Sequence, residues 1–436
     1  APTFGVIFDG ANASPAWNGG QSMIQVLNSR RLERDGDSFQ SAIIGIEIRN
    51  NGVLNSQGQS GGITANNSDL TIKGNYLHDL HSHDGAAISS QNQSKVVAVN
   101  NLIWNNQAKR WGAVFDTKAG AGDTQGSIYT SNSFWANAAT EGSAFYQDFG
   151  RGFFVNNVVR DGSSQEQYVD SVPSGESKGA VMLRKDSTES IILNKFLNNK
   201  VVSAYQPNSG AINIETEGST NLVLLNTFVG NSVPASYGAE SGSGGAIGVF
   251  NKSTPSIRYN LFQANTAGMG GSAISSSEQA LPQITNNMFY RNAVNNQTGS
   301  NNYRAGSGTI FIEGTSKSGA SPDIRSNYFE GNSGSQFPDI YLGDDSRANL
   351  SSNTFSDSVA TGNLYYSNSV TLPPPFNYTG LSLAGSVGVN NFKTSLAYNI
   401  TGNAFVPLSK SSLPSGIGWN DMLVDVSGTT LNLPGN

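Results

Sequence analysis

The sequence predicts an all-β protein, a right-handed parallel β-helix (a solenoid) of about ten to twelve coils with irregular terminal caps. Three observations predict this fold class. An asparagine-containing phrase recurs along most of the chain, and a glycine-containing phrase recurs between its copies. The composition is low in charged residues (13 %) but contains 9 % aromatic residues, which argues against disorder and supplies a core.

The first phrase reads apolar-x-x-Asn-x-apolar. Clear copies are Ile72-x-x-Asn75-x-Leu77 and Ile257-x-x-Asn260-x-Phe262. The series runs from Asn51 to Asn353 in steps of 24 to 40 residues, and a further copy follows after a step of 50 residues at Asn403. We expect each copy to mark one coil.

The second phrase reads Gly-small-small-apolar. It occurs at Gly85–Ile88, Gly142–Phe145, Gly244–Ile247 and Gly271–Ile274. Two apolar segments per repeat, each bounded by Gly or Asn, predict two short strands per coil. The repeat is shorter than the ~40–45 residues of a propeller blade and lacks the helical pattern of ankyrin or leucine-rich repeats.

The recurring side chains have structural roles in such a stack. Corresponding positions of successive coils lie about 4.8 Å apart. We expect the phenylalanines of the first phrase to point inward and stack on one another, namely Phe134, Phe196, Phe228, Phe262, Phe289, Phe329 and Phe355. We expect the asparagines to lie at tight turns, where Asn tolerates a left-handed backbone and amides hydrogen-bond along the stack.

The paired motifs resemble a known family. Gly-Gly-Ala-Ile at residues 244–247 alternates with Phe-x-x-Asn motifs such as Phe228–Asn231 and Phe262–Asn265. This pattern is similar to the repeat of polymorphic outer-membrane protein passengers and related prokaryotic adhesin-like β-helix proteins. The resemblance covers roughly residues 80–335 and implies a β-helix at the cell surface. It does not extend to that family's C-terminal translocator barrel, so its mode of anchoring is not implied.

The ends of the chain depart from the repeat. We expect residues 1–40 to form an N-terminal cap, residues 41–360 to form the β-helix, and residues 361–436 to form a last coil or cap. Within the first segment, Ser22–Arg34 predicts either a short capping helix or an irregular first coil.

The termini also carry a prediction about assembly. Phe4–Phe8 and Met422–Leu433 are strand-like, and a stack of coils has unpaired strand edges at its ends. These segments either cap their own stack or pair with a neighbouring molecule. The second alternative predicts head-to-tail self-association and makes residues 361–436 a candidate assembly segment.

Composition and charge bound the location and the partners. The net charge of −6 gives no electrostatic footprint for nucleic acid, and no apolar run reaches the ~18 residues of a membrane span. The first residue is Ala1, which fits the end left by signal-peptide removal. Together with the cysteine-free composition, this predicts an extracellular or cell-surface location. The sequence implies no cofactor, although it leaves room for a structural calcium ion.

A row of outward side chains is the first candidate site. The position three residues after the leading Asn reads His78, Trp104, Trp135 and Arg160 in consecutive coils. Sugar rings stack on tryptophan, and the strand spacing of about 5 Å is close to the repeat of a sugar chain. These four residues are therefore candidate glycan-binding residues. The alternative is that a neighbouring loop, such as Ala119–Thr124, covers both indoles.

The histidines suggest a second kind of site. His81 and His83, together with Asp84, are candidate metal ligands next to His78. Their spacing does not force them to converge, so a solvated polar turn or a glycan contact remains the alternative.

A second outward row follows the glycine phrase. It contains Asp148, Arg184 and Glu215, and the row beside it contains Tyr146. Asp148 and Glu215 would lie two coils apart, about 9–10 Å, near the upper limit for the carboxylates of an inverting glycosidase. Tyr146 and Arg184 could instead serve a polysaccharide lyase as base and charge neutraliser. The alternative is a set of cross-strand charge pairs, and no signature of pectate lyases or polygalacturonases is present.

Three functions therefore stay open. The leading hypothesis is a non-catalytic extracellular β-helix protein, acting as a cell-surface adhesin or as a matrix- or filament-forming subunit. The alternatives are a secreted polysaccharide-active enzyme using the Tyr146 row and a glycan-binding module using the Trp104 row. The expected partners of this protein are a surface or matrix polysaccharide and further copies of the same chain, but neither nucleic acid nor a membrane.

Overall fold

The computed structural model describes residues 6–10, 22–29, 32–34, 37–39, 41–52, 60–117, 126–165, 177–202, 207–234, 242–295, 308–314, 321–334, 338–342, 348–356, 359–360, 387–389, 399–401 and 404–405. These residues form strands and turns without a helix, so none of the described segments is a helix able to cross a membrane. The fold is a right-handed parallel β-helix of about 11 coils, as predicted. The chain divides into two compact units, Ala1–Tyr205 and Gln206–Asn436.

A complete coil contains four strands rather than the two predicted. In one coil of the first unit these are β12 (Lys95–Val99), β13 (Leu102–Trp104), β14 (Gln107–Trp111) and β15 (Val114–Thr117). Each pairs with its counterparts in the neighbouring coils, and we name the resulting sheets 1, 2, 3 and 4 in this order. The first phrase spans sheets 1 and 2 together, since Ile72 lies on a strand of sheet 1 and Leu77 on a strand of sheet 2, and it therefore read as one strand. Sheet 3 escaped the sequence patterns because several of its strands are only two residues long.

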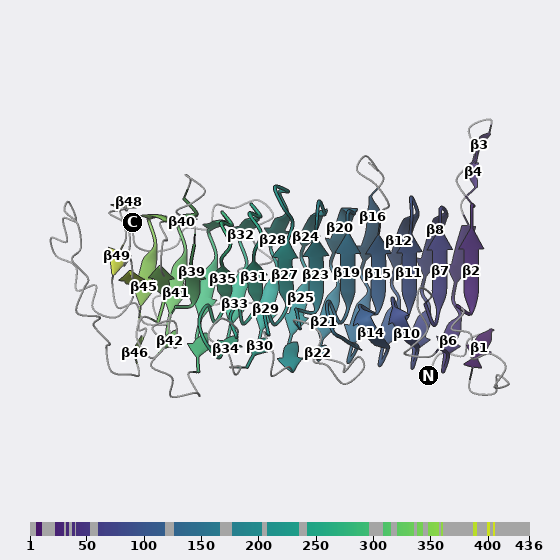
Figure 1. The fold of residues 1–436 in the computed structure, drawn as a ribbon, viewed down its shortest axis with the longest axis horizontal. Helices are drawn as coiled ribbons and strands as arrows, with labels where there is room; N and C mark the ends of the chain where they lie inside the picture. Colours follow the sequence, from purple (N-terminus) through teal and green to yellow (C-terminus); the bar gives the residue numbers. More distant parts are fainter. Residues whose placement is uncertain are drawn as a thin grey trace, which may run out of the picture. The chain divides into compact units, whose positions relative to one another are not determined.

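The first unit contains four parallel sheets (Figure 1). Sheet 1 has the order β5 (Ser41–Ile44), β8 (Asp69–Lys73), β12, β16 (Ser127–Thr130), β20 (Arg151–Val155) and β24 (Thr188–Ile192). Sheet 2 has the order β1 (Ile7–Asp9), β6 (Glu47–Arg49), β9 (Tyr76–His78), β13, β17 (Ser133–Trp135), β21 (Val158–Arg160) and β25 (Lys195–Leu197). Sheet 3 has the order β10 (His81–Asp84), β14, β18 (Ala138–Ala139), β22 (Ser163–Gln165) and β26 (Lys200–Val202). Sheet 4 has the order β2 (Ile24–Leu27), β7 (Ile63–Asn66), β11 (Ile88–Gln91), β15, β19 (Phe145–Asp148) and β23 (Val181–Arg184).

The second unit repeats the same coil order, and the sheet names apply to its corresponding strands. Sheet 1 contains β28 (Leu222–Leu224), β32 (Ser256–Arg258), β36 (Gln283–Thr285), β40 (Asp323–Arg325), β44 (Asn349–Ser351) and β48 (Asn399–Thr401). Sheet 2 contains β29 (Thr227–Val229), β33 (Leu261–Gln263), β37 (Met288–Tyr290), β41 (Tyr328–Glu330), β45 (Thr354–Ser356) and β49 (Ala404–Phe405). Sheet 3 contains β30 (Ser232–Val233), β34 (Thr266–Ala267), β38 (Ala293–Val294), β42 (Ser333–Gly334) and β46 (Val359–Ala360). Sheet 4 contains β27 (Ile212–Glu215), β31 (Ile247–Val249), β35 (Ile274–Ser276), β39 (Ile310–Ile312), β43 (Ile340–Leu342) and β47 (Val387–Val389).

The predicted asparagine ladder forms at the corner between sheets 1 and 2. Asn101 is buried, and its Oδ1 accepts hydrogen bonds from the backbone N–H and the Nδ2 of Asn75, each over 3.0 Å. Its own Nδ2 donates to the carbonyl of Ile72 over 2.8 Å. Each amide thus carries the hydrogen bonding of the sheets through the corner. The ladder contains Asn75, Asn101, Asn132, Asn157 and Asn194 in the first unit and Asn226, Asn260, Asn287, Asn327 and Asn353 in the second.

The ladder asparagine is not the residue with the left-handed backbone. That conformation belongs to the residue before it, such as Asn100 with φ 55°. The same pair occurs between sheets 2 and 3, where Asn105 has φ 52° and the buried Asn106 bonds to Asn137. The two residues have different roles: the first adopts the left-handed conformation that bends the chain, and the second therefore keeps its side chain in position for the ladder. The turn from sheet 3 to sheet 4 uses glycine, for example Gly112 with φ 48°.

The predicted phenylalanine stack is clearest in the second unit. Phe228, Phe262, Phe289 and Phe329 are fully buried, with successive ring centroids 4.8, 4.9 and 4.7 Å apart and nearly parallel. In the first unit the same column contains Phe134 and Phe196 but has Val159 between them. The backbone of β45 continues the column at Phe355.

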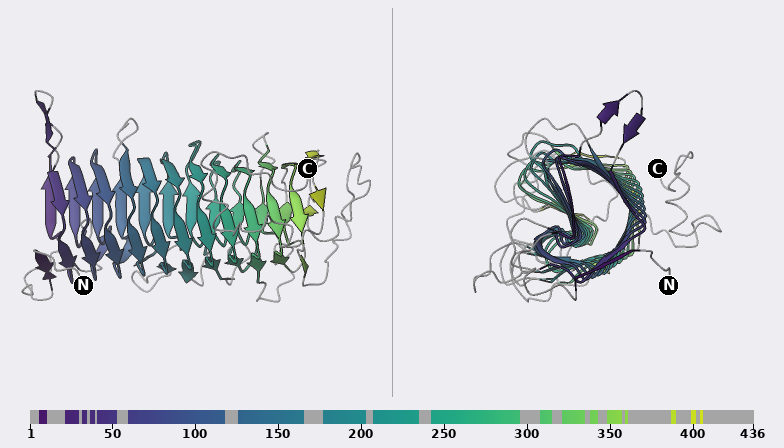
Figure 2. Two further views of the ribbon diagram at one scale, coloured as in Figure 1. Left: turned by 180° about the vertical axis from the view of Figure 1, so that it is seen from behind. Right: turned by 90° about the vertical axis from the view of Figure 1, so that its right-hand side faces the viewer.

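The N-terminal segment differs from the prediction. Residues 24–27 form β2, which pairs in parallel with β7, so the predicted capping helix is wrong. The reason is the period of two in Ile24-Gln25-Val26-Leu27, whose Ile24 and Val26 match core positions of β7. An antiparallel hairpin, β3 (Leu32–Arg34) and β4 (Asp37–Phe39), follows and projects away from the coil (Figure 2). Viewed along the stack in the same figure, the purple and blue coils of the first unit superpose.

The proposed terminal pairing segments lie largely outside the described residues. Met422–Leu433 is not described, and of Phe4–Phe8 only the part from residue 6 is described, where β1 begins at Ile7. In the last predicted segment, β47, β48 and β49 pair with β43, β44 and β45, which places a further coil after residue 360.

Candidate functional site

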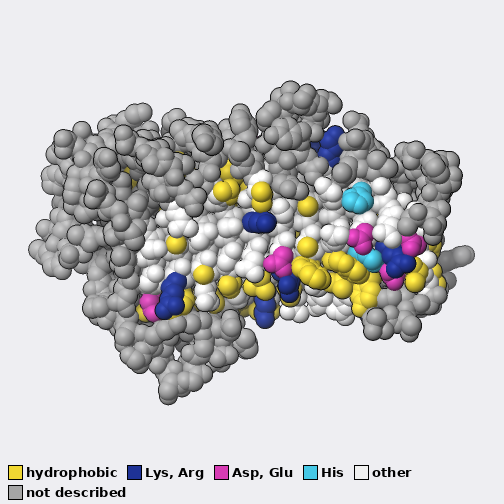
Figure 3. Space-filling model, turned by 90° about the horizontal axis from the view of Figure 1, so that it is seen from below, with side chains coloured by type: hydrophobic (Ala, Val, Ile, Leu, Met, Phe, Trp, Pro, Cys, Tyr) yellow, Lys and Arg dark blue, Asp and Glu magenta, His cyan; other side chains and the backbone are white. Residues whose placement is uncertain are grey.

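The outer face of sheet 2 in the first unit carries two columns of side chains. From β1 to β25, one column contains Asp9, Arg49, His78, Trp104, Trp135, Arg160 and Leu197, and the other contains Ile7, Glu47, Tyr76, Leu102, Ser133, Val158 and Lys195. The predicted row of His78, Trp104, Trp135 and Arg160 is thus one continuous column. We call Tyr76 and these four residues the aromatic strip. Figure 3 shows hydrophobic side chains gathered in a band on this face, with charged side chains next to it.

Trp104 is held in place by its neighbours. The imidazole of His78 stacks on the indole, with centroids 3.8 Å apart and planes within 11°. Tyr76 contacts the same indole edge-to-face at 5.7 Å. One face of Trp104 is therefore covered, and the ring is half-buried. His78, predicted as an exposed flank of the strip, is itself only 8 % exposed.

Trp135 presents the larger free surface. The side chain is 45 % exposed, and among the described residues no ring stacks on it. The guanidinium of Arg160 lies 5.3 Å from the centroid of the indole, and Asp161 Oδ2 accepts a hydrogen bond from Arg160 Nε over 2.8 Å. The two tryptophans are neighbours in register without stacking on each other, so ring surface remains open to solvent. Residues 119–124, the loop considered as a cover, lie outside the described residues.

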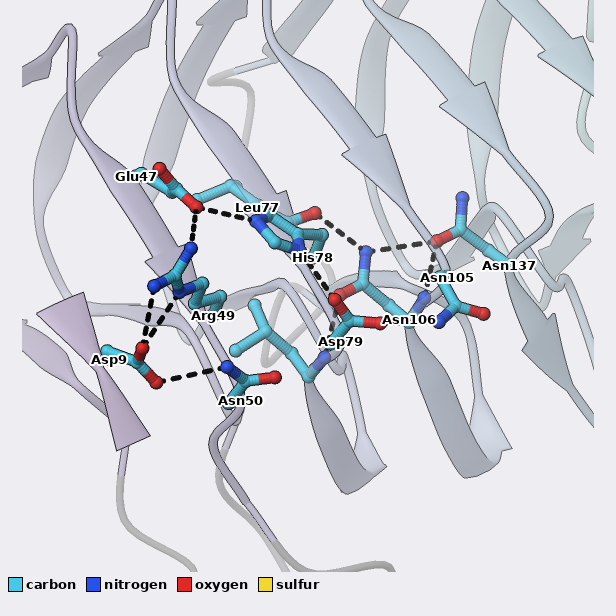
Figure 4. A network of polar contacts seen from close by, with 11 residues as sticks. Asp9, Glu47, Arg49, Asn50, Leu77, His78, Asp79, Asn105, Asn106 and Asn137 are labelled. Carbon is cyan, nitrogen blue, oxygen red and sulfur yellow. Dashed lines mark hydrogen bonds and ion pairs between the residues drawn. The ribbon is translucent and has the colours of Figure 1, made fainter. Parts of the chain in front are cut away.

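A chain of charged groups fixes His78 (Figure 4). Its Nδ1 lies 2.6 Å from Asp79 Oδ2, and its Nε2 lies 3.0 Å from Glu47 Oε1. Glu47 also pairs with Arg49, whose guanidinium pairs with Asp9 of β1 at 2.8 Å. The imidazole is held from both sides, which fixes the plane on which Trp104 rests.

The network shifts the pKa of two of its members. Burial raises the pKa of the Asp79 carboxyl, but hydrogen bonds from His78 and Asn105 outweigh burial and lower that pKa overall. The hydrogen bond to Asp9 is the main cause that raises the pKa of the Arg49 guanidinium. Asp79 therefore remains a carboxylate over the range in which histidine titrates.

The corner after sheet 2 explains why the network assembles here. Asp79 and Asn105 are the left-handed residues of successive coils, with φ 54° and 52°, so their side chains meet at the surface. One residue further on, Asn106 Nδ2 donates to the carbonyl of Leu77 over 3.0 Å and to Asn137 (Figure 4). The buried amides thus fix the backbone from which the exposed side chains project.

The predicted catalytic row has a different character. Tyr146 is fully buried, with Phe115 and Met182 beside it in register and the indole of Trp111 stacked on it at 4.8 Å. Burial raises the pKa of the Tyr146 phenol, and Arg184 Nη1 donates to its hydroxyl over 3.3 Å. A tyrosine in this state is a poor proton acceptor.

The charged members of this row are mostly paired. Asp148 is 5 % exposed and forms an ion pair with Lys185, while Arg184 lies 3.5 Å from Glu141. The register places Arg184 directly beside Asp148. Glu215 belongs to the second unit, where it accepts a hydrogen bond from Asn213 over 2.8 Å. This arrangement corresponds to the cross-strand charge pairs that the sequence left as the alternative.

The histidine cluster is spread along one strand. His81 and His83 lie on β10, and His83 Nδ1 is 3.0 Å from Asp84 Oδ1. Burial lowers the pKa of His81 and raises the pKa of Asp84. In the part of the chain that the structure describes, no three His, Cys, Asp or Glu side chains are grouped as a metal site would need.

Sequence reasoning missed several members of the site. Glu47, Arg49 and Asp9 were not singled out, although they complete the charged network. A usable signal existed, because Glu47-x-Arg49 and Tyr76-x-His78 occupy the same two outward positions of successive strands. Asp9 lay in the segment predicted as a cap and so had no assigned register.

The site can provide stacking and hydrogen bonding. Tyr76, Trp104 and Trp135 supply apolar ring surface, and the flanking charged groups supply donors and acceptors at both ends. The buried row around Tyr146 supplies neither an open surface nor an obvious base. Comparisons with models of known protein families, with curated proteins and with solved structures found no significant match.

Proposed function

We propose that this chain is a non-catalytic extracellular β-helix protein of the adhesin type that binds a glycan along the aromatic strip. The observation that carries the proposal is the 45 % exposed Trp135, next to the immobilised Trp104 in one column of sheet 2. The extracellular location rests on the cysteine-free composition and on the resemblance to adhesin-like repeats. Matrix or filament formation through the termini remains part of the proposal.

The strip has the properties that a sugar chain requires. A large exposed apolar side chain costs solvation free energy unless a ligand covers it. Aromatic side chains with an apolar body and a polar tip suit sugars, which alternate apolar ring faces with hydroxyl groups. Successive positions of the column repeat at about 4.8 Å, so a glycan running along it would meet an equivalent position at each sugar residue.

Pre-organisation also favours binding. His78 and Tyr76 hold the Trp104 indole, and Asp79 and Glu47 hold His78. A ring that is already fixed loses little conformational entropy when a ligand arrives.

A polysaccharide-active enzyme is less well supported. Its general base would be Tyr146, which is buried and whose raised pKa keeps the phenol protonated, so that it has no site free to accept a proton from a substrate. Asp148 is buried and paired with Lys185.

The proposal is tested by titrating the protein with a panel of oligosaccharides while recording tryptophan fluorescence and binding heat. At least one glycan class is expected to change the emission, and Trp135→Ala is expected to remove that response, with Trp104→Ala weakening it. Phe153→Ala is the matched control, because Phe153 is 49 % exposed on sheet 1 of the same unit. Loss of binding in the control, or unchanged binding in Trp135→Ala, would contradict the proposal.

A further inference from the structure

We propose that the ligand of the aromatic strip is an acidic glycan that binds in one direction, with its negatively charged sugar toward β25. This inference rests on the proposed function and adds the class and orientation of the ligand. It is carried by the distribution of charge along the outer face of sheet 2.

The end of the strip toward β25 carries an excess of positive charge. Arg160 and Lys195 both project from the outer face, in neighbouring strands, and both side chains are exposed. Asp161 pairs with Arg160, but in the part of the chain that the structure describes no carboxylate pairs with Lys195. Lys200, the first residue of β26 on the adjacent sheet, is also exposed. Of the residues that the structure describes here, these three cations and one anion sum to a net charge of +2.

The opposite end has the reverse sign. Asp9, Glu47 and Asp79 gather there around Arg49 and His78. Among the described residues, these three carboxylates outnumber the one guanidinium, so the cluster is net negative, by −2 with a neutral imidazole and by −1 with a charged one. The lowered pKa of Asp79 keeps that carboxyl charged.

The spacing connects Lys195 to the exposed indole. Lys195 lies in the column next to that of Trp135, two residues or about 7 Å to the side. Along the stack, Trp135 on β17 and Lys195 on β25 are two strand steps apart, which correspond to about 10 Å. This distance is close to two sugar residues, and the flexible four-carbon stem of lysine lets its ammonium group follow the ligand. A sugar resting on Trp135 therefore places the second sugar along within reach of Lys195.

The polarity makes binding directional. A carboxylate or sulfate on the glycan is attracted by Arg160 and Lys195 and repelled by Glu47 and Asp79. The neutral part of the chain would then lie over Trp104 and Trp135. Charge complementarity of this kind selects the ligand and its orientation more than it adds raw affinity.

The experiment uses calorimetric titration of the whole protein with an oligosaccharide whose terminal sugar is its one uronic acid, and with the methyl ester of the same oligomer. The acidic form is expected to bind about fivefold more tightly at low salt, and the difference is expected to shrink as the salt concentration rises. Lys195→Gln is expected to remove the difference and leave the affinity for the ester unchanged. Lys73→Gln, an exposed lysine on β8 of sheet 1, is the matched control and is expected to preserve it.

The outcomes separate the two proposals. Equal binding of acid and ester, or an acid preference that survives in Lys195→Gln, overturns the acidic class and leaves glycan binding intact. Failure of both oligomers and of the whole neutral panel overturns the proposed function as well. A sulfated polysaccharide without carboxylates, tested in parallel, shows whether the preferred anionic group is sulfate or carboxylate, and either result supports the inference. Tighter binding of single-stranded oligodeoxythymidylate than of any glycan would overturn both proposals.

Discussion

Replacing Asn287 with alanine is expected to destabilise the second unit by about 4 kcal/mol, within a range of about 3–6 kcal/mol. Its Oδ1 accepts hydrogen bonds from the backbone N–H and the Nδ2 of Asn260 at 2.9 and 3.0 Å. Its Nδ2 donates to the carbonyl of Ile257 at 2.9 Å and to Asn327 Oδ1 at 3.1 Å. Four buried hydrogen bonds are lost, at about 0.5–1.5 kcal/mol each, and the orphaned groups of Asn260 and Ile257 stay buried.

The adjacent residue provides the control. Asn286 has φ 57° and makes the bend, so Asn286→Gly keeps the conformation at no steric cost and is expected to change stability by less than about 0.5 kcal/mol. Asn286→Ala retains the strain of a left-handed residue and is expected to cost about 1 kcal/mol. The order of the three variants thus separates hydrogen bonding from backbone conformation.

The assay is urea denaturation followed by circular dichroism, combined with hydrogen exchange at the Asn260 amide. Exchange is needed because repeat proteins open locally, and the amide that loses its partner reports the opening of that coil alone. A cost of less than about 1 kcal/mol for Asn287→Ala would contradict this role of the ladder amide. Equal destabilisation by Asn286→Gly and Asn287→Ala would contradict it as well.

Other perturbations test other parts of the fold and site. Phe262→Ala is expected to cost about 3–5 kcal/mol because the ring is stacked and fully buried, whereas Phe153→Ala, at an exposed position, is expected to cost little; denaturant midpoints measure both. The pKa of the Asp79 carboxyl is lower in the folded protein than in the unfolded chain. The contribution of this carboxylate to the free energy of unfolding is therefore fully present above pH ~3.9, its pKa in the unfolded chain, and is lost as the pH falls through its pKa in the folded protein. In His78→Phe this acid-induced loss is expected to be smaller, and carboxyl ¹³C chemical shifts against pH should show a higher pKa for Asp79. The raised pKa of Tyr146 predicts that its phenol stays protonated in alkaline solution while exposed tyrosines ionise, so Tyr146→Phe should leave the absorbance titration of the folded protein unchanged.

The repeats made the core predictable from sequence. Asn260 and Phe262 recur with their neighbours fixed, and a side chain that repeats in every coil must stack on its own copies. The number of strands per coil was not predictable in the same way. Strands of two residues, such as Ala138–Ala139, carry no periodicity of their own and exist because the neighbouring coil supplies their partners.

The site shows the limit of register arguments. Counting residues correctly placed His78, Trp104 and Trp135 in one outward column. The same counting placed Tyr146 outward, but Trp111 from the adjacent sheet packs over it and buries it. Alternation along a strand identifies the side of the sheet on which a residue lies, whereas its cover comes from segments distant in sequence.

The coil corners differ in how much length they accept. In the described coils the connections from sheet 1 to sheet 2 and from sheet 2 to sheet 3 always contain two residues, as between Val99 and Leu102. The connections on either side of sheet 4 vary, with two residues between Trp111 and Val114 but 15 between Gln165 and Val181.

Insertions and deletions next to sheet 4 therefore leave the outer face of sheet 2 unaltered. On that face, equivalent side chains of successive coils lie one strand spacing apart, about 4.8 Å, regardless of how many residues each repeat contains. A whole coil inserted between β13 and β17 would increase the separation of the Trp104 and Trp135 indoles by one strand spacing. Deletion of the coil that contains β21 would bring Lys195 one strand spacing closer to Trp135. Changes in the number of coils can thus lengthen or shorten this column of outward side chains in fixed increments while every coil keeps the same core.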